Sequence, residues 1–214
     1  VFSDDIYAPA QNFSNEFVHG QYDDQKKINE FTNKADVITY EFENIPYETL
    51  NKINKFKPVL PKPSVNRIIQ HRLAEKDFIN KLNIRTTRYA SIQKKSEMDS
   101  MQDLLPGLLK TTTLGYDGKG QYLINSIEDL DSQSIDFSKD YILEKLVKLK
   151  KEISIIITRF NDKEYEIYEP IENTHEDQML KYSKIPAKIN DKTLNQSKLW
   201  AIQIAEELKY IGTL

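Results

Sequence analysis

The order of hydrophobic and polar residues changes its period along the first part of the chain. Residues 36–41 read Asp-Val-Ile-Thr-Tyr-Glu, a short β-branched run typical of a strand buried on both faces. The segments on either side, 23–34 and 46–56, place apolar residues at helical spacing among charged ones. The order helix, strand, helix predicts an α/β layer, and prolines at 58, 61 and 63 form a rigid connector that ends it.

A second group of elements is predicted from residue 64 onwards. Ser64 can cap a helix whose apolar face is formed by Ile68, Ile69, Leu73, Phe78, Ile79 and Leu82. A further helix is predicted at 97–105, and strands are predicted at 89–92, 108–112, 121–124, 141–145 and 152–160. Residues 164–170 are expected to pair with the last of these strands as a hairpin. Apolar residues at 194, 199, 202, 205 and 208 predict a helix, after which residues 210–214 begin another strand.

Composition narrows the class of protein. The 214 residues suit one large domain or two small ones. Thirty Lys and Arg stand against 33 Asp and Glu, and a net charge of -3 does not favour a nucleic-acid partner. The absence of cysteine excludes a disulfide scaffold and a thiolate metal site, and it fits a reducing cytoplasm. No apolar run approaches the roughly 20 residues that cross a bilayer, so no membrane partner is expected.

The strongest candidate for chemistry is the segment 115–121, Gly-Tyr-Asp-Gly-Lys-Gly-Gln, which lies between two predicted strands. Three glycines in six residues permit positive φ and a close approach of the backbone to a ligand. Successive backbone amides in such a turn can hold a phosphate, and Lys119 adds positive charge. Asp-Gly is also a common turn pair, so an ordinary hairpin turn remains the alternative.

Four single residues add weaker indications. Lys110 follows two leucines, so its stem should lie near the core while its ammonium group points into a cleft. Glu144 could cap a helix or accept hydrogen bonds from ribose hydroxyls, and both Glu144 and Glu152 could instead be solvated strand ends. His175, one of three histidines, could be a general base, a phosphate donor or an ordinary loop residue. A Walker loop and a Gly-x-Ser-x-Gly elbow are both absent, which excludes a P-loop NTPase and argues against acyl-serine chemistry.

Taken in order, five segments of the chain resemble one family, the 5-(carboxyamino)imidazole ribonucleotide synthetases of the ATP-grasp superfamily. The segments are 36–45, 71–76 (His-Arg-Leu-Ala-Glu-Lys), 110–121, 152–157 and 170–175. The segment 110–121, Lys-Thr-Thr-Thr-Leu-Gly-Tyr-Asp-Gly-Lys-Gly-Gln, is the most specific of them. Five motifs in one order are much less probable by chance than any one motif.

The resemblance implies an ATP-grasp fold, α/β and α+β, truncated and joined to part of a Rossmann-like pre-ATP-grasp domain. The expected domains are a partial N-terminal domain at 1–63, a linking helix and the start of the central domain at 64–85, a small lid subdomain at 86–150, and the start of a second subdomain at 151–214. The family's first glycine-rich loop and its later metal-binding carboxylates are absent, so no metal ligand is expected within this chain. These residues alone are therefore expected to lack ligase activity.

The family joins bicarbonate to the amine of 5-aminoimidazole ribonucleotide in purine biosynthesis, consuming ATP with Mg²⁺, and is typically a cytoplasmic homodimer. By resemblance, Lys110 and His175 are catalytic candidates, and Tyr116, Asp117 and Lys119 would also reach the ribonucleotide. The implied ATP-binding residues are Arg72, Lys110, Gly115, Tyr116, Asp117, Gly118, Lys119, Gly120, Gln121, Glu144, Lys145, Leu146, Val147, Glu152 and His175. Among them, Arg72 and Lys110 would contact the phosphates, and backbone groups of Lys145 and Val147 would read the base.

The chain departs from the family pattern at two positions. Leu114 stands where the family has Gly, and Thr112 stands near the place of a common Arg, so a stiffer lid and weaker phosphate binding are expected.

The sequence leaves three alternative functions open. The first alternative is another ATP-grasp carboxylate–amine ligase, such as a phosphoribosylglycinamide ligase or a biotin carboxylase. The second is a non-catalytic nucleotide-binding fragment. The third is an α/β domain whose glycine turn binds nothing.

Overall fold

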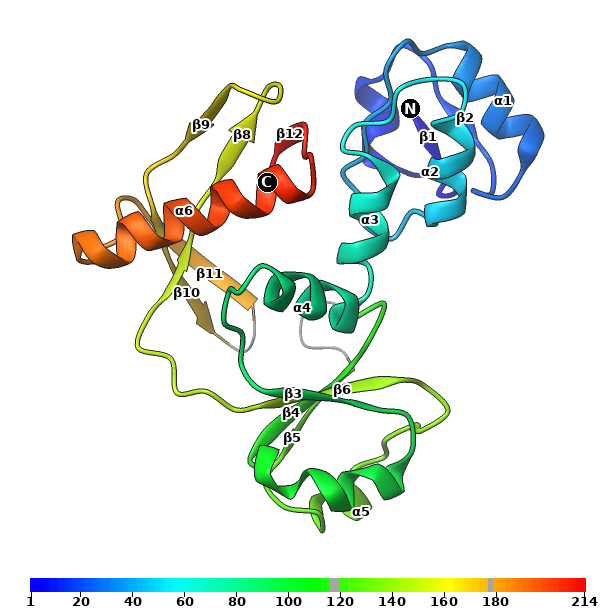
Figure 1. The fold of residues 1–214 in the computed structure, drawn as a ribbon. Coiled ribbons are helices and arrows are strands. Elements are labelled where there is room, and N and C mark those ends of the chain that lie inside the picture. Colours follow the sequence, from blue (N-terminus) through cyan, green and yellow to red (C-terminus); the bar gives the residue numbers. More distant parts are fainter. Residues whose placement is uncertain (116–119, 177–178) are drawn as a thin grey trace. The chain divides into compact units, whose positions relative to one another are not determined.

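The computed structural model describes residues 1–115, 120–176 and 179–214 (Figure 1). The chain divides into two compact units, one formed by residues 1–67 with 210–212 and the other by 68–209 with 213–214. Each unit has its own hydrophobic core. Within the described ranges no helix is long and apolar enough to cross a membrane.

The first unit contains a small parallel sheet and short helices. Strand β1 (Phe2–Ser3) pairs in parallel with β2 (Val18–His19), and the 3₁₀ helix η1 (Pro9–Phe13) lies between them in sequence. Helices α1 (Gln25–Asn33) and α2 (Tyr47–Ile53) confirm the two helical patterns of this region. Asp24 begins α1, because its side chain accepts hydrogen bonds from two backbone N–H groups of the first turn.

The strand predicted at 36–41 is reduced to one bridge. Ile38 is buried in the core of the first unit with Leu50, Ile53 and Val59, as its apolar pattern indicates. Its only pairing in the described part of the chain is an isolated parallel bridge to Val59. A β-branched run predicts burial, but a strand also needs a neighbour over several residues. Only Ile38 of this run is buried, and its neighbour Val37 is 57% exposed, so the predictions of a full strand and of burial on both faces are wrong.

The second unit is built on a four-stranded antiparallel sheet. Its strands, in spatial order, are β3 (Tyr89–Ile92), β6 (Tyr141–Lys145), β4 (Gly107–Thr111) and β5 (Gln121–Ile124). The 3₁₀ helix η2 (Lys95–Leu104) and α5 (Asp129–Ser132) cover one face, and α4 (Arg72–Lys81) covers the other (Figure 1). The core lies between the sheet and η2, where Ile92, Met98, Leu109, Tyr141 and Leu143 are fully or almost fully buried.

The single helix predicted from residue 64 is two helices, α3 (Pro63–Ile69) and α4. Ser64 lies inside α3 and does not cap it, whereas His71 begins α4 by accepting a hydrogen bond from the N–H of Ala74. The N–H of Arg72 donates to the carbonyl oxygen of Thr112 at 2.9 Å. This bond between the start of α4 and the end of β4 is a tertiary contact, which apolar periodicity does not predict.

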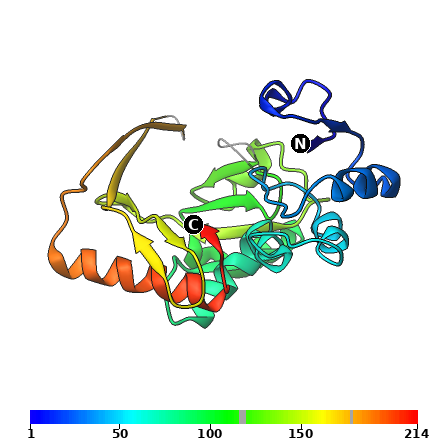
Figure 2. The same ribbon diagram turned by 90° about the horizontal axis from the view of Figure 1, so that it is seen from above.

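The predicted strand at 152–160 is also divided. Strand β7 (Glu152–Ser154) pairs with β10 (Ile171–Glu176), which pairs with β11 (Met179–Lys184). Strand β8 (Ile157–Arg159) belongs to another sheet, between β9 (Tyr165–Ile167) and β12 (Gly212–Thr213). The expected hairpin with the segment after residue 164 is confirmed. Helix α6 (Asp191–Glu207) runs beside β8 (Figure 2).

Candidate functional site

Charged side chains gather on the face of the four-stranded sheet that α4 covers. Paired residues of an antiparallel ladder point to the same side of the sheet, and alternate pairs point to opposite sides. Glu144 pairs with Tyr89 and with Leu108, and two residues along β4 Lys110 pairs with Ile142. These residues therefore share one face, while Leu109 and Leu143, which alternate with them, enter the core on the other.

Glu144 lies at the centre of this charged group and is buried. The ammonium of Lys110 donates to its Oε2 at 3.0 Å. The ammonium of Lys76, which projects from α4, lies 3.4 Å from Oε1. Each carboxylate oxygen thus has its own cation, which compensates the loss of water around a buried charge. We call Lys76, Lys110 and Glu144 the ion triad.

Arg72 extends the charged group towards the glycine-rich segment. Its guanidinium donates to the carbonyl oxygen of Gly115 at 3.0 Å. Gly120 has φ of +70°, and a Cβ there would lie 2.8 Å from the hydroxyl oxygen of Thr111, so both backbone conformation and space require glycine. Tyr116, Asp117, Gly118 and Lys119, which the sequence assigned to the same segment, lie outside the described residues.

The two departures from the family pattern have clear structural settings. Leu114 is 73% exposed and has φ of +58°, a left-handed conformation that glycine adopts without strain. Thr112 is buried, and both its N–H and its hydroxyl donate to the carbonyl oxygen of Asp140. Position 112 therefore faces the protein interior and Leu114 faces solvent.

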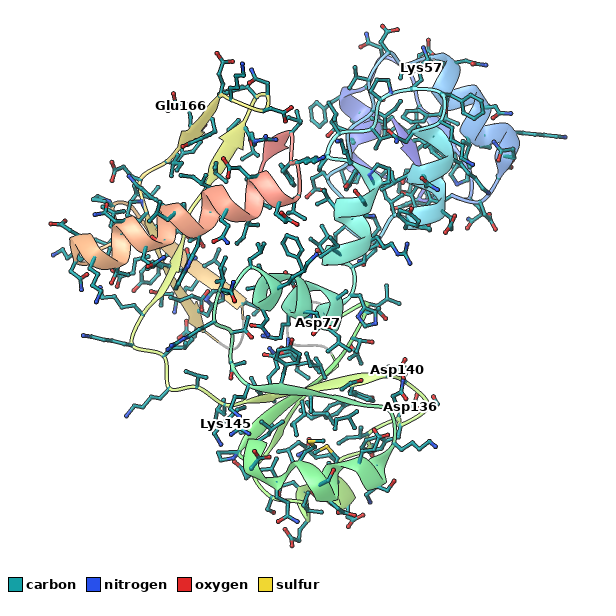
Figure 3. The ribbon with its side chains drawn as sticks, viewed as in Figure 1. Lys57, Asp77, Asp136, Asp140, Lys145 and Glu166 are labelled. Atoms are coloured by element: carbon teal, nitrogen blue, oxygen red, sulfur yellow. The ribbon has the colours of Figure 1, made fainter. Side chains whose placement is uncertain are left out.

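The segment Glu144–Val147 leaves the sheet at the end of β6. The N–H of Lys145 donates to the carbonyl oxygen of Arg88 at 2.8 Å, so this amide is already engaged. Its carbonyl oxygen accepts from the Thr87 hydroxyl at 2.7 Å but keeps a second lone pair that can accept from a ligand. The Lys145 ammonium donates to the carbonyl oxygen of Asp103, and Figure 3 shows this side chain at the margin of the sheet. Base recognition through Lys145 would thus use its carbonyl group.

Glu152 and His175 form a second group. They lie on the paired strands β7 and β10, and His175 Nδ1 is 3.2 Å from Glu152 Oε1. His175 is therefore a strand residue, which excludes the loop position considered from sequence. Beside them, Lys151 forms an ion pair with Glu172 at 2.7 Å. Among the described residues no hydrogen bond or ion pair joins this second group to the ion triad.

The sequence indicated no role for Lys76, although this residue lies in the family-like segment 71–76. The available signal was spacing, because Lys76 follows Arg72 by four residues and such residues lie on one face of a helix. The burial of Glu144 was also missed, since an acid at the end of a strand is more often solvated.

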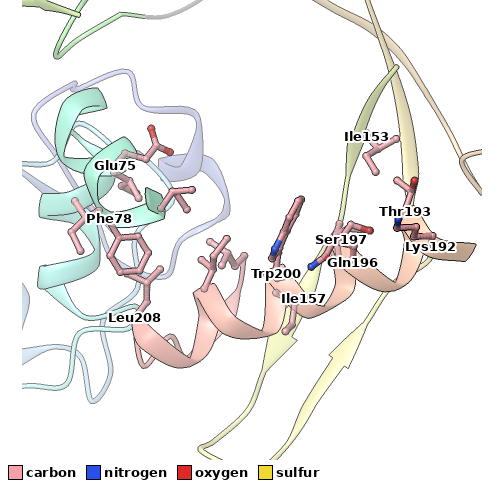
Figure 4. A pocket seen from close by; sticks show the side chains of 17 residues that line it. Glu75, Phe78, Ile153, Ile157, Lys192, Thr193, Gln196, Ser197, Trp200 and Leu208 are labelled. Carbon is pink, nitrogen blue, oxygen red and sulfur yellow. The ribbon is translucent and has the colours of Figure 1, made fainter. Parts of the chain in front are cut away.

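A cavity of about 690 Å³ lies away from these charged residues (Figure 4). It is lined mainly by apolar residues of α3, α4, α6 and the β7–β8 segment, including Phe78, Ile153, Ile157 and Trp200. Glu75 and Lys192 are its charged residues, and none of the sequence-predicted site residues lines it. An apolar cavity with one acid and one base does not suit a polyphosphate, so the candidate site remains the charged face of the sheet. The described residues include no group of three or more His, Asp or Glu that could hold a metal ion.

The fold and the charged face define the class of protein. Residues 77–214 match the ATP-grasp domain model and residues 1–70 match the ribonucleotide synthetase preATP-grasp domain model, so the chain belongs to the ATP-grasp family. Both the suspected resemblance and the expected fold class are thereby confirmed. The limits of the four expected domains and the roles of the site residues stay predictions.

Individual relatives show which ATP-grasp proteins the chain is similar to. The chain is 33% identical over 208 residues to N5-carboxyaminoimidazole ribonucleotide synthase of Staphylococcus aureus strain COL, covering 96% of this chain and 55% of that protein. The Brucella melitensis synthase is 33% identical over 211 residues, covering 96% of this chain and 58% of the relative. The crystal structure of the Staphylococcus aureus synthetase complexed with ADP superposes with a TM-score of 0.91 at 32% identity, covering 100% of this chain and 57% of that one. The chain thus spans about half the length of the relatives it matches.

Proposed function

We propose that this protein takes part in the ATP-dependent carboxylation of 5-aminoimidazole ribonucleotide by bicarbonate, a carbon–nitrogen ligase reaction of purine biosynthesis. The products are 5-(carboxyamino)imidazole ribonucleotide, ADP and phosphate. The proposal is supported by relatives that carry the name of this synthase and by five motifs in the family order. The observation that carries it is the cluster of Arg72 and the ion triad at the start of the glycine-rich segment.

The reaction needs activation because bicarbonate is a poor electrophile. Transfer of the γ-phosphoryl group of ATP to a bicarbonate oxygen gives carboxyphosphate and ADP. The amine then forms the new C–N bond and phosphate leaves. Positive charge around the transferred group stabilises the transition state, and Arg72 and Lys110 are the cations that we assign to the phosphates.

Water must be kept from carboxyphosphate, because hydrolysis would waste the intermediate. We assign this role to the segment 115–121, closing over the phosphates as a lid. The bond from Arg72 to the Gly115 carbonyl oxygen supports the assignment, because it ties a phosphate-binding cation to the start of the lid. We further assign Tyr116, Asp117 and Lys119 to the ribonucleotide, although these residues lie outside the described part of the chain.

The remaining residues are assigned to the adenine and ribose of the nucleotide and to the reaction centre. Glu144 to Val147 would line the adenine and ribose pocket, with the Lys145 carbonyl group accepting from the base. Glu152 would accept from ribose hydroxyls, and its contact with His175 would orient the imidazole towards the reaction centre. We propose that Mg²⁺ enters with the phosphates of ATP, and we assign it no ligand from the described residues. We also propose a cytoplasmic homodimer, as is typical of the family.

Calorimetric titration tests the proposal in two steps. The first compares ATP with adenosine, and ATP is expected to bind more tightly because the cations recognise phosphate. The second, in saturating ADP, compares 5-aminoimidazole ribonucleotide with glycine and biotin. Preference for glycine or biotin would favour another ATP-grasp ligase. Failure to bind any adenine nucleotide would overturn the proposal.

A non-catalytic nucleotide-binding protein is the second candidate, and the strained φ of Leu114 favours it because a stiff lid would close poorly. ADP release is measured with ATP, bicarbonate and the ribonucleotide to distinguish the two. Tight ATP binding without any ADP release in the longest available form of the protein would support the non-catalytic reading.

A further inference from the structure

Lys76 is the member of the ion triad for which neither the sequence nor the proposed function provides a role. We propose that Lys76 is a positioning residue that keeps Glu144 paired while Lys110 contacts the phosphates of a nucleotide. This inference rests on the proposed nucleotide site and adds to it a residue that acts through another residue.

The arrangement of the triad allows the two lysines to act separately. Lys110 and Lys76 approach different oxygens of Glu144, at 3.0 and 3.4 Å. All three side chains are largely buried, with exposed fractions of 17%, 19% and 11% for Lys110, Lys76 and Glu144. Neither lysine blocks the other, so one can leave the carboxylate while the other remains.

Lys76 is held in place independently of Lys110. Its ammonium lies 5.8 Å from the centre of the Tyr89 ring, a favourable distance for a cation–π contact. The Tyr89 hydroxyl donates to Asp77 at 2.6 Å and accepts from Asn80 at 2.9 Å, so two further hydrogen bonds join α4 to β3 next to this contact. Lys76 is thus fixed over the sheet by residues that need not move when a nucleotide binds.

The energetic argument concerns the carboxylate that Lys110 leaves behind. Burying a charge without a partner is strongly unfavourable. If Lys110 were its only partner, the Glu144 carboxylate would compete with a nucleotide phosphate for the Lys110 ammonium. With Lys76 on the other oxygen, the carboxylate stays paired when Lys110 turns away. Lys76 therefore increases the affinity for phosphate-bearing nucleotides without touching them.

A double-mutant cycle tests the proposal, because it separates action through Glu144 from a direct phosphate contact. Titrations with ATP, ADP and adenosine are made on the wild type, Lys76→Met, Glu144→Gln and the double variant. We expect Lys76→Met to weaken ATP binding roughly tenfold and to leave adenosine binding unchanged, as for the loss of one charge-assisted contact. In the Glu144→Gln background the same change should alter the ATP dissociation constant by less than about twofold, because a neutral amide needs no cation. Lys76→Arg should bind ATP as the wild type does.

Each other outcome has a definite meaning. An equal loss in both backgrounds would overturn the proposal, because Lys76 would then contact phosphate directly. An equal loss for adenosine and ATP would also overturn it, because the effect would be a general distortion of the site. The matched control is Lys95→Met, which removes an exposed lysine of η2 paired with Asp131. This variant should leave the dissociation constants of ATP and adenosine unchanged. If the wild type binds no ATP, the proposed function fails and this inference with it; if the wild type binds and Lys76→Met matches it, only this inference fails.

Discussion

Replacing Lys110 by Met is the most direct test of the charged face, because it removes the ammonium and keeps most of the apolar stem. In the structure this ammonium donates to Glu144 at 3.0 Å, and in the proposed complex it contacts the phosphates. The variant therefore separates two contributions, one to nucleotide binding and one to the stability of the fold.

The expected effect on binding is large. A hydrogen bond to a charged group contributes about 1.5–3 kcal/mol, so the ATP dissociation constant should rise by about 10-fold to 150-fold. Breaking a buried ion pair can cost about 3–5 kcal/mol of folding stability when it leaves one charge alone. Here Lys76 still lies 3.4 Å from the other oxygen of Glu144. The loss of unfolding free energy should consequently be closer to about 1 kcal/mol, the upper range for exposed pairs.

Calorimetry with ATP and adenosine measures the first contribution, and urea unfolding measures the second. Lys95→Met is again the control, since its side chain is 49% exposed on the covering layer opposite α4. Unchanged ATP affinity in the Lys110 variant would refute the assignment of Lys110 to the phosphates. A stability loss near the full cost of an orphaned charge would instead refute the claim that Lys76 is an effective second partner.

Three further predictions concern stability. Leu114→Gly should raise the unfolding free energy by about 0.5 kcal/mol, because relief of positive φ outweighs the added chain entropy, and an unchanged urea midpoint would contradict this. Leu143→Ala, at a fully buried core position, should lower it by about 2–5 kcal/mol, and a smaller loss would show that the core can collapse around the gap. Burial raises the pKa of Tyr40 to about 12. The unfolded chain then loses the phenol proton near the ordinary tyrosine pKa of about 10, while the folded chain retains it. The free energy of unfolding should therefore fall as the pH rises from about 10 to about 12. Tyr40→Phe should reduce that fall in urea unfolding at pH 9 and 11, and an identical fall in both proteins would exclude Tyr40 as its source.

Local patterns predicted most of the regular elements. The helical spacing of apolar residues located α1, α2 and α6, and short apolar runs located the four strands of the large sheet. These patterns are informative because a helix or a strand buries one face of its own sequence, whatever its neighbours are. The order of five motifs also identified the family, and its glycine-rich segment marked one end of the charged face.

Other features depend on which segments become neighbours in space. One apolar run, 152–160, serves two sheets because its halves pair with strands from different parts of the chain. One helical pattern is divided at residues 70–71, where the start of α4 bonds to the end of β4. In both places the apolar pattern continues without a break, but the two parts of the segment contact different neighbours.

The sequence by itself determined most of the regular elements, the family and the residue types available for binding a nucleotide. Only the tertiary structure decided that Glu144 is buried, that Lys110 and Lys76 share it, and that Arg72 reaches the backbone of Gly115. The reason is physical: the partners of a charged side chain are set by the register of strands and by the helix packed over them. Those contacts join residues distant in sequence, and local hydrophobic periodicity carries no information about them.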